Sequence, residues 1–229
     1  MNDFSRHEKL IGAEGMEKLS EAHVAIFGIG GVGGYTAEAL SRAAVGRITL
    51  IDSDNVEVTN INRQIVALKS TVGEPKVLVM QSRIKDINPH CAVTTKMVFV
   101  TAENAGELLT DITYAIDAVD NVSAKLAIIT ACREKDIPII SAMGAGNKLA
   151  GIFHVADVFD TKNDALARVM RRELRKRGIE SLKVVCSDMP GVQEVTANEP
   201  IPSISYMPGL CGLTIAGEVI RDIIGWKNG

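Results

Sequence analysis

The sequence predicts an α/β protein with a Rossmann-like, doubly wound and mostly parallel sheet. Short apolar segments alternate with segments of helical length, which is typical of βαβ units. Of the 229 residues 46% are hydrophobic but only 4% are aromatic, and such Val-, Ile- and Ala-rich strands suit a parallel sheet buried on both faces. A glycine-rich turn follows the first apolar segment.

Composition and charge exclude several other classes of protein. The apolar fraction is high and the formal net charge is only −3, so intrinsic disorder is not expected. The N-terminal segment lacks the apolar core of a signal peptide. The longest apolar stretch, residues 204–220, contains Pro208 and Glu218, which favours a buried helix over a membrane span. We expect a cytoplasmic protein that does not enter a membrane.

The residues up to about 150 are expected to form a nucleotide-binding core. We expect strands at residues 23–27, 47–51, 91–97, 114–118 and 137–142. We expect helices at residues 6–19, 74–87, 103–109 and 123–135. Another helix follows the glycine-rich turn and ends near Ala44, and Asn88-Pro89 closes the helix at 74–87.

After residue 150 the alternation changes. We expect a strand at residues 151–159, a basic amphipathic helix at 165–176 and an apolar helix at 209–224. Residues 187–203 are polar and rich in Pro, Gly, Asn and Glu, which predicts a mobile loop. We interpret 1–229 as one domain, in which 151–229 extend the sheet on the substrate side.

The glycine-rich turn has the sequence context of a nucleotide-binding loop. Gly28, Gly30, Gly31 and Gly33 lie between an expected strand and an expected helix. Glycines allow a tight turn and close approach of the backbone, and the helix N-terminus offers N–H groups to a phosphate. Asp52 ends the second strand, where a carboxylate can accept hydrogen bonds from ribose hydroxyls. The motif indicates an adenine nucleotide but does not separate NAD from ATP.

A polar cluster after Asp52 favours ATP. Its members are Asp54, Asn60, Asn62, Arg63, Gln64 and Lys76. Attack on a nucleotide phosphate needs cations that neutralise developing charge, a role open to Arg63 and Lys76, and a carboxylate that holds magnesium, a role open to Asp120. Taken singly, Lys76 could be a solvated helix residue and Arg63 a surface ion-pair partner. Hydride transfer to NAD, however, would not require any residue of this cluster.

The basic helix at 165–176 carries a one-sided stripe of charge. The stripe consists of Arg168, Arg171, Arg172 and Arg175. Glu173 is the only acid between residues 165 and 178, so salt bridges at helical spacing account for few of these charges. The stripe indicates contact with a nucleic-acid backbone. A solvated helix face is the alternative.

Longer segments resemble a known superfamily. The string GIGGVGGYTAEALSRAAVGRITLIDSDNVEVTNINRQ and the later pieces YAIDAVDNVSAK and CREKDIPIISAMGAG are similar to the adenylation core of the HesA/MoeB/ThiF superfamily, which is related to ubiquitin-activating enzymes. Within it, TNINRQ, DALARVMRRELRKRG and SISYMPGLCGLTIAGEVIRDII resemble the tRNA threonylcarbamoyladenosine dehydratases.

The resemblance implies ATP and magnesium as cofactors and a tRNA substrate. In these dehydratases a carboxylate of threonylcarbamoyladenosine, in the anticodon loop, attacks the α-phosphate of ATP; the acyl-adenylate then cyclises and AMP departs. The four glycines, with Asn60, Arg63 and Lys76, would face the phosphates, Asp52 would hold the ribose and Asp120 the magnesium. Arg6 would reach the ATP site of a partner subunit, so a homodimer is implied, and the arginine stripe would contact tRNA.

Two alternatives share parts of this site. The first is adenylation of the C-terminus of a ubiquitin-like sulfur-carrier protein, with a sulfur-transfer protein as partner; relatives of that kind commonly carry paired CxxC zinc ligands. No CxxC pair occurs here, so no zinc is expected. A thiol-transfer step would need a cysteine such as Cys186, which is more typical of a small buried residue. The second alternative is an NAD-dependent oxidoreductase or a nucleotide sensor.

Overall fold

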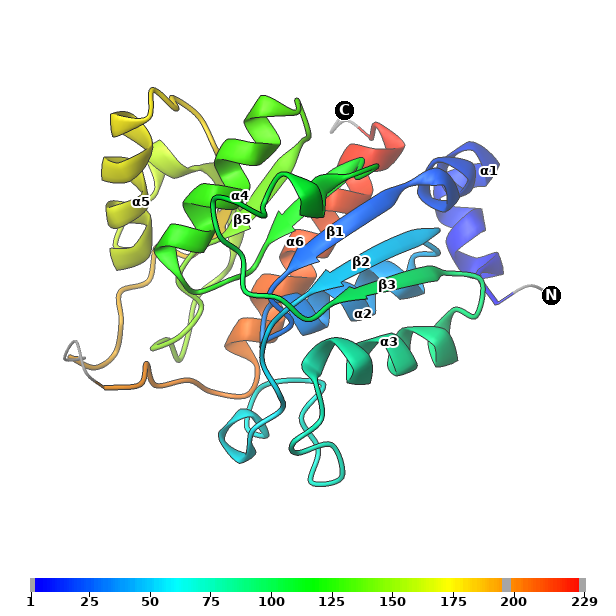
Figure 1. The fold of residues 1–229 in the computed structure, drawn as a ribbon, viewed down its shortest axis with the longest axis horizontal. Helices are drawn as coiled ribbons and strands as arrows, with labels where there is room; N and C mark the ends of the chain where they lie inside the picture. The colour runs from blue at the N-terminus through cyan, green and yellow to red at the C-terminus, as the bar shows by residue number, and fades with distance from the viewer. Residues whose placement is uncertain (1–2, 195–198, 227–229) are drawn as a thin grey trace.

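A seven-stranded sheet with the strand order β3-β2-β1-β4-β5-β7-β6 forms the centre of the molecule (Figure 1). The computed structural model describes residues 3–194 and 199–226. The strands are β1 (His23–Phe27), β2 (Arg47–Ile51), β3 (Ala92–Lys96), β4 (Tyr114–Asp117), β5 (Ile139–Ala142), β6 (His154–Asp157) and β7 (Lys183–Cys186). All neighbouring pairs are parallel except β6 and β7, which confirms the expected fold class.

Helices cover both faces of this sheet. They are α1 (Ser5–Glu21), α2 (Gly33–Arg42), α3 (Lys76–Ile87), α4 (Val122–Glu134), α5 (Ala165–Lys176) and α6 (Met207–Ile224). Three short 3₁₀ turns are η1 (Val58–Asn60), η2 (Glu107–Leu109) and η3 (Val158–Asp160). Successive side chains of β1 point to opposite faces of the sheet and therefore pack in two different hydrophobic cores. Val24 and Ile26 pack with α2, α3 and α6, whereas Ala25 and Phe27 pack with α4.

The strand order places a topological switch point beside β1. The chain runs from β1 outward to β2 and β3, then crosses to β4 on the other side of β1. In open parallel sheets a crevice forms outside the carboxyl ends of the strands at such a point, and ligands bind there. None of the helices in the described part of the chain is long and apolar enough to cross a membrane.

A buried ion pair fixes α4 beneath this crevice. The ammonium of Lys125 on α4 lies 3.0 Å from a carboxylate oxygen of Asp117, and both side chains are fully buried. Lys125 also donates to the carbonyl of Ala142 at 2.8 Å. Lys125 therefore joins α4 to the ends of β4 and β5. The loops that follow these two strands line the crevice.

Several sequence predictions are corrected by the structure. The expected helix at 103–109 is wrong except for η2, because the Asn104 side chain accepts the N–H of Thr101 and donates to the carbonyl of Phe99, and such local bonds compete with a helix. The expected strand at 151–159 is reduced to β6. Gly151 has φ +117, and the Asp157 side chain accepts the N–H of Phe159 to begin η3.

In the C-terminal half, one strand was missed by the sequence-based prediction and one predicted loop is only partly described. The sequence-based prediction missed β7, which lies between β5 and β6 in the sheet. In the predicted loop at 187–203, the described residues contain no helix or strand. Residues 195–198 lie outside the described residues, and the mobility of this loop stays a prediction.

Candidate active site

A cleft of about 730 Å³ opens at the carboxyl ends of the parallel strands. Most of the predicted site residues line it. They are Gly28, Gly30, Gly31, Asp52, Asp54, Arg63, Gln64, Lys76 and Asp120. They come from the segments that follow β1, β2 and β4, so the switch point brings together residues that are far apart in the sequence.

Glycine is required in the loop between β1 and α2 for steric reasons. Gly28 has φ +87, and a Cβ there would lie 2.7 Å from the carbonyl oxygen of Ala118. A Cβ on Gly33 would lie 1.8 Å from the carbonyl oxygen of Gly28. Gly33 is buried and does not line the cleft; it allows α2 to begin directly against the end of β1. The free N–H groups at this end of α2 suit an anion.

Asp52 clamps the glycine loop to the end of β2. One carboxylate oxygen accepts the N–H of Ile29 at 2.6 Å, and the other accepts the N–H of Asp54 at 2.8 Å. Burial raises the pKa of Asp52, and the two backbone hydrogen bonds oppose this shift. Each carboxylate oxygen keeps a second acceptor position for a hydroxyl group. This geometry is compatible with a contact to ribose hydroxyls, which stays a prediction.

Two cations at the cleft are held by neighbouring oxygens. The Lys76 ammonium is buried and lies 2.8 Å from a carboxylate oxygen of the exposed Asp54. The guanidinium of Arg63 donates to the carbonyl of Thr59 and to the side-chain oxygen of Asn62, both at 2.9 Å. These contacts position both cations where an anionic ligand can add to, or replace, their present partners.

One buried acceptor at the cleft has no partner in the described residues. The side-chain oxygen of Gln64 makes no hydrogen bond although the residue is only 8% exposed. An unsatisfied buried polar atom costs about 1–3 kcal/mol. The side-chain nitrogen of Gln64 lies 3.8 Å from the position of a Cβ on Gly30, so this amide borders the glycine loop. A ligand donor would satisfy the free oxygen.

Sequence reasoning missed the opposite wall of the cleft. The wall is lined by the last residue of β5 and the residues after it, 142–148, and by Asp164, the N-cap of α5. One carboxylate oxygen of Asp164 accepts the N–H of Gly144 at 2.9 Å, and the other caps α5 through Ala167. The signal that could have found this wall is the pair Gly144 and Gly146 directly after an apolar strand.

Besides Gly33, two further predicted site residues lie outside the cleft of this chain. Asn60 does not line it; its side-chain oxygen accepts the N–H of Glu57 and so stabilises η1. Arg6 is exposed on α1 and does not line the cleft either. A phosphate contact by Asn60 and a reach into a partner subunit by Arg6 stay predictions.

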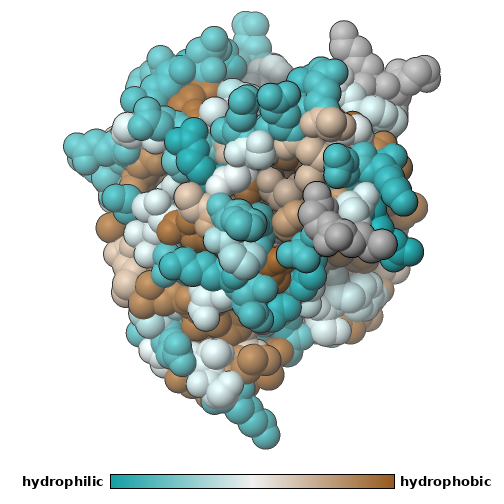
Figure 2. Space-filling view, turned by 90° about the vertical axis from the view of Figure 1, so that its right-hand side faces the viewer, coloured by the Kyte–Doolittle hydropathy of each residue, from teal (hydrophilic) through white to brown (hydrophobic). Residues whose placement is uncertain are grey.

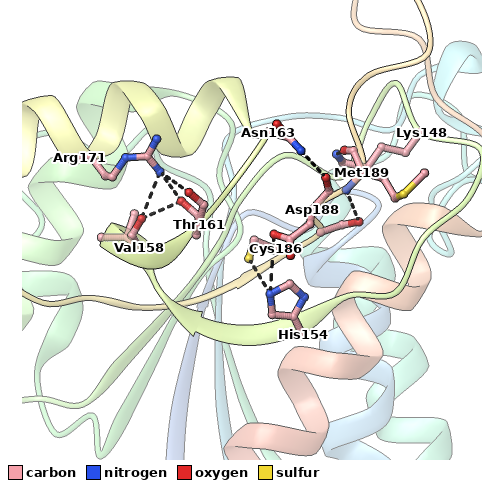
Figure 3. A network of polar contacts seen from close by, with 10 residues as sticks. Lys148, His154, Val158, Thr161, Asn163, Arg171, Cys186, Asp188 and Met189 are labelled. Carbon is pink, nitrogen blue, oxygen red and sulfur yellow. Dashed lines mark hydrogen bonds and ion pairs between the residues drawn. The ribbon is translucent and has the colours of Figure 1, made fainter.

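The arginine stripe of α5 is more engaged than its sequence indicates. Arg171 donates to the carbonyls of Val158 and Thr161 (Figure 3). Arg175 lies over the ring of Phe159, 5.1 Å from its centroid. As expected, salt bridges account for few of the stripe's charges, since within the described residues only Arg172 of the four pairs with Glu173; backbone carbonyls and an aromatic ring engage two of the others.

The single acid of this helix is shared by several cations. Glu173 pairs with Arg172, Lys176 and Arg177, which lower its pKa to about 2. The side chain of Arg168 makes no hydrogen bond or ion pair within the described residues. Arg168 and Arg175 are both exposed, and no acid pairs with either of them within the described residues.

Comparison with known proteins assigns the family. The ThiF family model matches residues 4–229, so this chain belongs to the ThiF family. It is 41% identical to the tRNA threonylcarbamoyladenosine dehydratase of Bacillus subtilis over 98% of this chain and 95% of that protein. It is 39% identical to the sulfur carrier protein adenylyltransferase of Thermus thermophilus, but over only 52% of this chain and 44% of that protein.

The fold has a close structural counterpart. The E. coli tRNA N6-threonylcarbamoyladenosine dehydratase TcdA, in complex with AMP, superposes with a TM-score of 0.91 at 34% identity, over 97% of this chain and 94% of that one. The same E. coli protein in complex with ATP gives a TM-score of 0.90, with 93% of that chain covered.

The close approach of α2 to β1 makes a testable prediction. Replacement of Gly33 by Ala should lower the free energy of unfolding by about 3 kcal/mol or more, because a Cβ cannot fit against the Gly28 carbonyl. Gly217→Ala in α6 is the matched control, since its Cβ would meet only the end of the Arg221 side chain at 3.5 Å; it should be stabilising by up to ~1 kcal/mol. Urea denaturation measures both, and equal stabilities for the two variants would contradict the packing argument.

Proposed function

We propose that this chain uses ATP to dehydrate threonylcarbamoyladenosine in the anticodon loop of tRNA. The observation that carries the proposal is the cleft itself, in which a glycine loop and Asp52 stand beside Arg63, Lys76 and Asp120. Similarity to named dehydratases extends over nearly the whole chain, including the wall beyond residue 142 that lies on the acceptor side.

The reaction consists of two substitutions. The carboxylate of the nucleoside attacks the α-phosphate of ATP, and the bond to the pyrophosphate oxygen breaks. The carbamoyl part of the same side chain then attacks the activated carboxyl carbon and gives up a proton, and AMP leaves with one carboxylate oxygen. The nucleoside thereby loses one equivalent of water, and ATP becomes AMP and pyrophosphate.

The residues of the cleft have distinct tasks in this sequence of steps. Asp52 accepts the ribose hydroxyls, and the N–H groups of the glycine loop face the phosphates. Arg63 and Lys76 neutralise the charge that develops at the attacked phosphate, and such charge stabilisation usually contributes more to catalysis than any other single effect. Gln64, with its free acceptor, binds a donor of the nucleotide.

Asp120 is the residue that would hold magnesium. It is exposed at the cleft, directly after β4, and no hydrogen bond or ion pair engages its carboxylate within the described residues. Magnesium prefers carboxylate and phosphate oxygens and would supply positive charge next to the leaving pyrophosphate.

The tRNA surface in this proposal is the outer face of α5. The N-terminal residues of α5, Ala165 and Leu166, line the cleft, so a phosphate backbone bound along this helix passes close to the nucleotide. Arg168 and Arg175 provide the accessible charges. A tRNA substrate implies a cytoplasmic protein.

A homodimer completes the proposed assembly. The face on the α1 and β3 side mixes hydrophobic with hydrophilic residues (Figure 2). Exposed apolar side chains occur on the loop between β2 and α3, including Val58 at 68% and Leu68 at 56%. Association through such a surface would allow Arg6 to approach a partner's cleft.

Adenylation of a carrier protein is the second candidate function. The observation that favours it is the 39% identity to the sulfur carrier protein adenylyltransferase of Thermus thermophilus. That similarity covers about half of this chain, whereas similarity to the dehydratases extends over nearly all of it.

The proposal is tested by the acceptor that drives AMP release. We expect the purified protein to release AMP and pyrophosphate from ATP and magnesium only when tRNA carrying threonylcarbamoyladenosine is present. The control is the same tRNA without the modification, which has no carboxylate to activate. AMP release driven by a ubiquitin-like carrier protein, with modified tRNA inert, would overturn the proposal.

The role of Asp120 is tested separately. Asp120→Ala should reduce AMP release by about a hundredfold or more, because charge at the leaving group is no longer neutralised. Its melting temperature should be unchanged, since the side chain has no partner to lose. The control is Asp86→Ala, which removes another exposed acid, on α3, and should retain full activity. Near-normal turnover of Asp120→Ala would contradict the assigned metal role.

The arginine stripe makes a prediction about tRNA binding. The double variant Arg168→Glu/Arg175→Glu should weaken tRNA binding by about tenfold or more, and the slope of its salt dependence should fall by about one for each phosphate that is no longer neutralised. ATP affinity should not change. Lys85→Glu/Arg133→Glu alters the net charge equally, on exposed positions of α3 and α4, and should bind tRNA like the unmodified protein. Equal tRNA affinity for both double variants would exclude α5 from the binding surface.

A further inference from the structure

Three metal-ligating side chains converge at the sheet edge formed by β6 and β7, outside the cleft (Figure 3). They are His154, Cys186 and Asp188, and their ligand atoms all lie within 4.8 Å of one another. None of the three lines the cleft, and the proposed dehydration uses none of them. We propose that this cluster is a binding site for a divalent transition-metal ion of the zinc class.

The sheet holds two of these ligands in register. His154 is the first residue of β6 and Cys186 the last residue of β7, and the two are direct partners in the antiparallel pair. Directly opposed residues in such a pair have Cβ atoms about 4.5–5.5 Å apart on one face. The backbone therefore presents the imidazole and the sulfur side by side before any ion arrives.

The distances suit an ion between the ligands. The Nε2 atom of His154 lies 3.6 Å from the Sγ atom of Cys186 and 4.0 Å from a carboxylate oxygen of Asp188. Tetrahedral zinc, with bonds of about 2.3 Å to sulfur and about 2.0 Å to nitrogen and oxygen, separates its ligand atoms by about 3.3–3.6 Å. The cysteine–histidine pair already has this separation. The carboxylate of Asp188 needs only a small shift, and its side chain is 54% exposed and free to make it.

These side chains have no strong polar contacts elsewhere. In residues 3–194 and 199–226, the polar contacts of the Cys186 sulfur and the Asp188 carboxylate are with His154 alone. The 4.0 Å separation of Asp188 from His154 is longer than a hydrogen bond.

The ligand types select the metal. A thiolate, an imidazole and a carboxylate are together a borderline-soft set that suits zinc or cobalt(II) rather than magnesium or calcium. Binding releases the thiol proton of Cys186 to solvent, and a water molecule completes four-coordination on the exposed side. This arrangement departs from the expectation of no zinc, which rested on the lack of CxxC pairs; here the cysteine and histidine are 32 residues apart and are brought together by strand pairing.

An ion at this position would fasten the edge of the sheet to a wall of the cleft. The segment that carries Asp188 is bonded to cleft residues, since Asn163 donates to the Asp188 carbonyl at 3.0 Å and Lys148 donates to the carbonyl of Met189 (Figure 3). The metal would therefore limit the movement of residues 186–189, and it would stabilise the folded protein by mass action.

Cobalt(II) is the probe that tests the site, because a thiolate ligand gives a charge-transfer absorption in the near ultraviolet. The full chain, reduced and freed of metal by a chelator, is titrated with cobalt, and zinc is then added as a competitor. We expect one equivalent to bind with the thiolate band, zinc to displace it, and both metals to raise the melting temperature.

Variants identify the ligands. Cys186→Ser should abolish the thiolate band, and His154→Gln should weaken cobalt binding by about tenfold or more, with a smaller loss for Asp188→Asn. The side chain of His154 is 42% exposed, so its substitution leaves the core intact. If Cys186→Ser does not fold, the cobalt affinity of His154→Gln still tests whether this cluster binds the metal. Cys91→Ser and His90→Gln change the same residue types elsewhere and should bind cobalt normally. Absence of the thiolate band with excess cobalt, persistence of the band in Cys186→Ser, or an unchanged cobalt affinity of His154→Gln would overturn the proposal.

Discussion

The close approach of α2 to the carboxyl end of β1 is the constraint on which the site depends. Only a residue without a Cβ fits at Gly33, which lies against the Gly28 carbonyl. This contact directs the N-terminus of α2 into the switch point of the sheet. Asp52 then fixes the loop from the other side by accepting the N–H of Ile29. Backbone N–H groups and a carboxylate are thus placed for a nucleotide before it binds.

The polar groups of the cleft are held in place, but some of them can still accept a ligand as a partner. Lys76 is held by Asp54 and Arg63 by oxygens of its own segment, while the side-chain oxygen of Gln64 has no partner in the described residues. A triphosphate would recruit both cations without a large rearrangement, and such preorganisation lowers the cost of stabilising charge in a transition state. The opposite wall of the cleft is built separately, by the loop after β5 and the cap of α5.

The sequence predicted the fold class, the glycine loop and most of the ATP side of the cleft, because these depend on local patterns. Residues 165–176 form a helix with the predicted bounds. Features that depend on pairing between distant segments were missed: β7 is a four-residue strand inserted between β5 and β6, and the wall at Asp164 is made by tertiary contacts. The engagement of Arg171 with η3 also required knowledge of which segment packs against α5.

The measurement that tests this account most directly is the mass of the modified nucleoside after the protein, ATP and magnesium act on tRNA carrying threonylcarbamoyladenosine. Digestion of the tRNA and mass spectrometry should show the nucleoside lighter by one water, with one AMP formed for each nucleoside converted. An unchanged nucleoside, recovered while the protein consumes ATP with another acceptor, would contradict the proposed tRNA substrate.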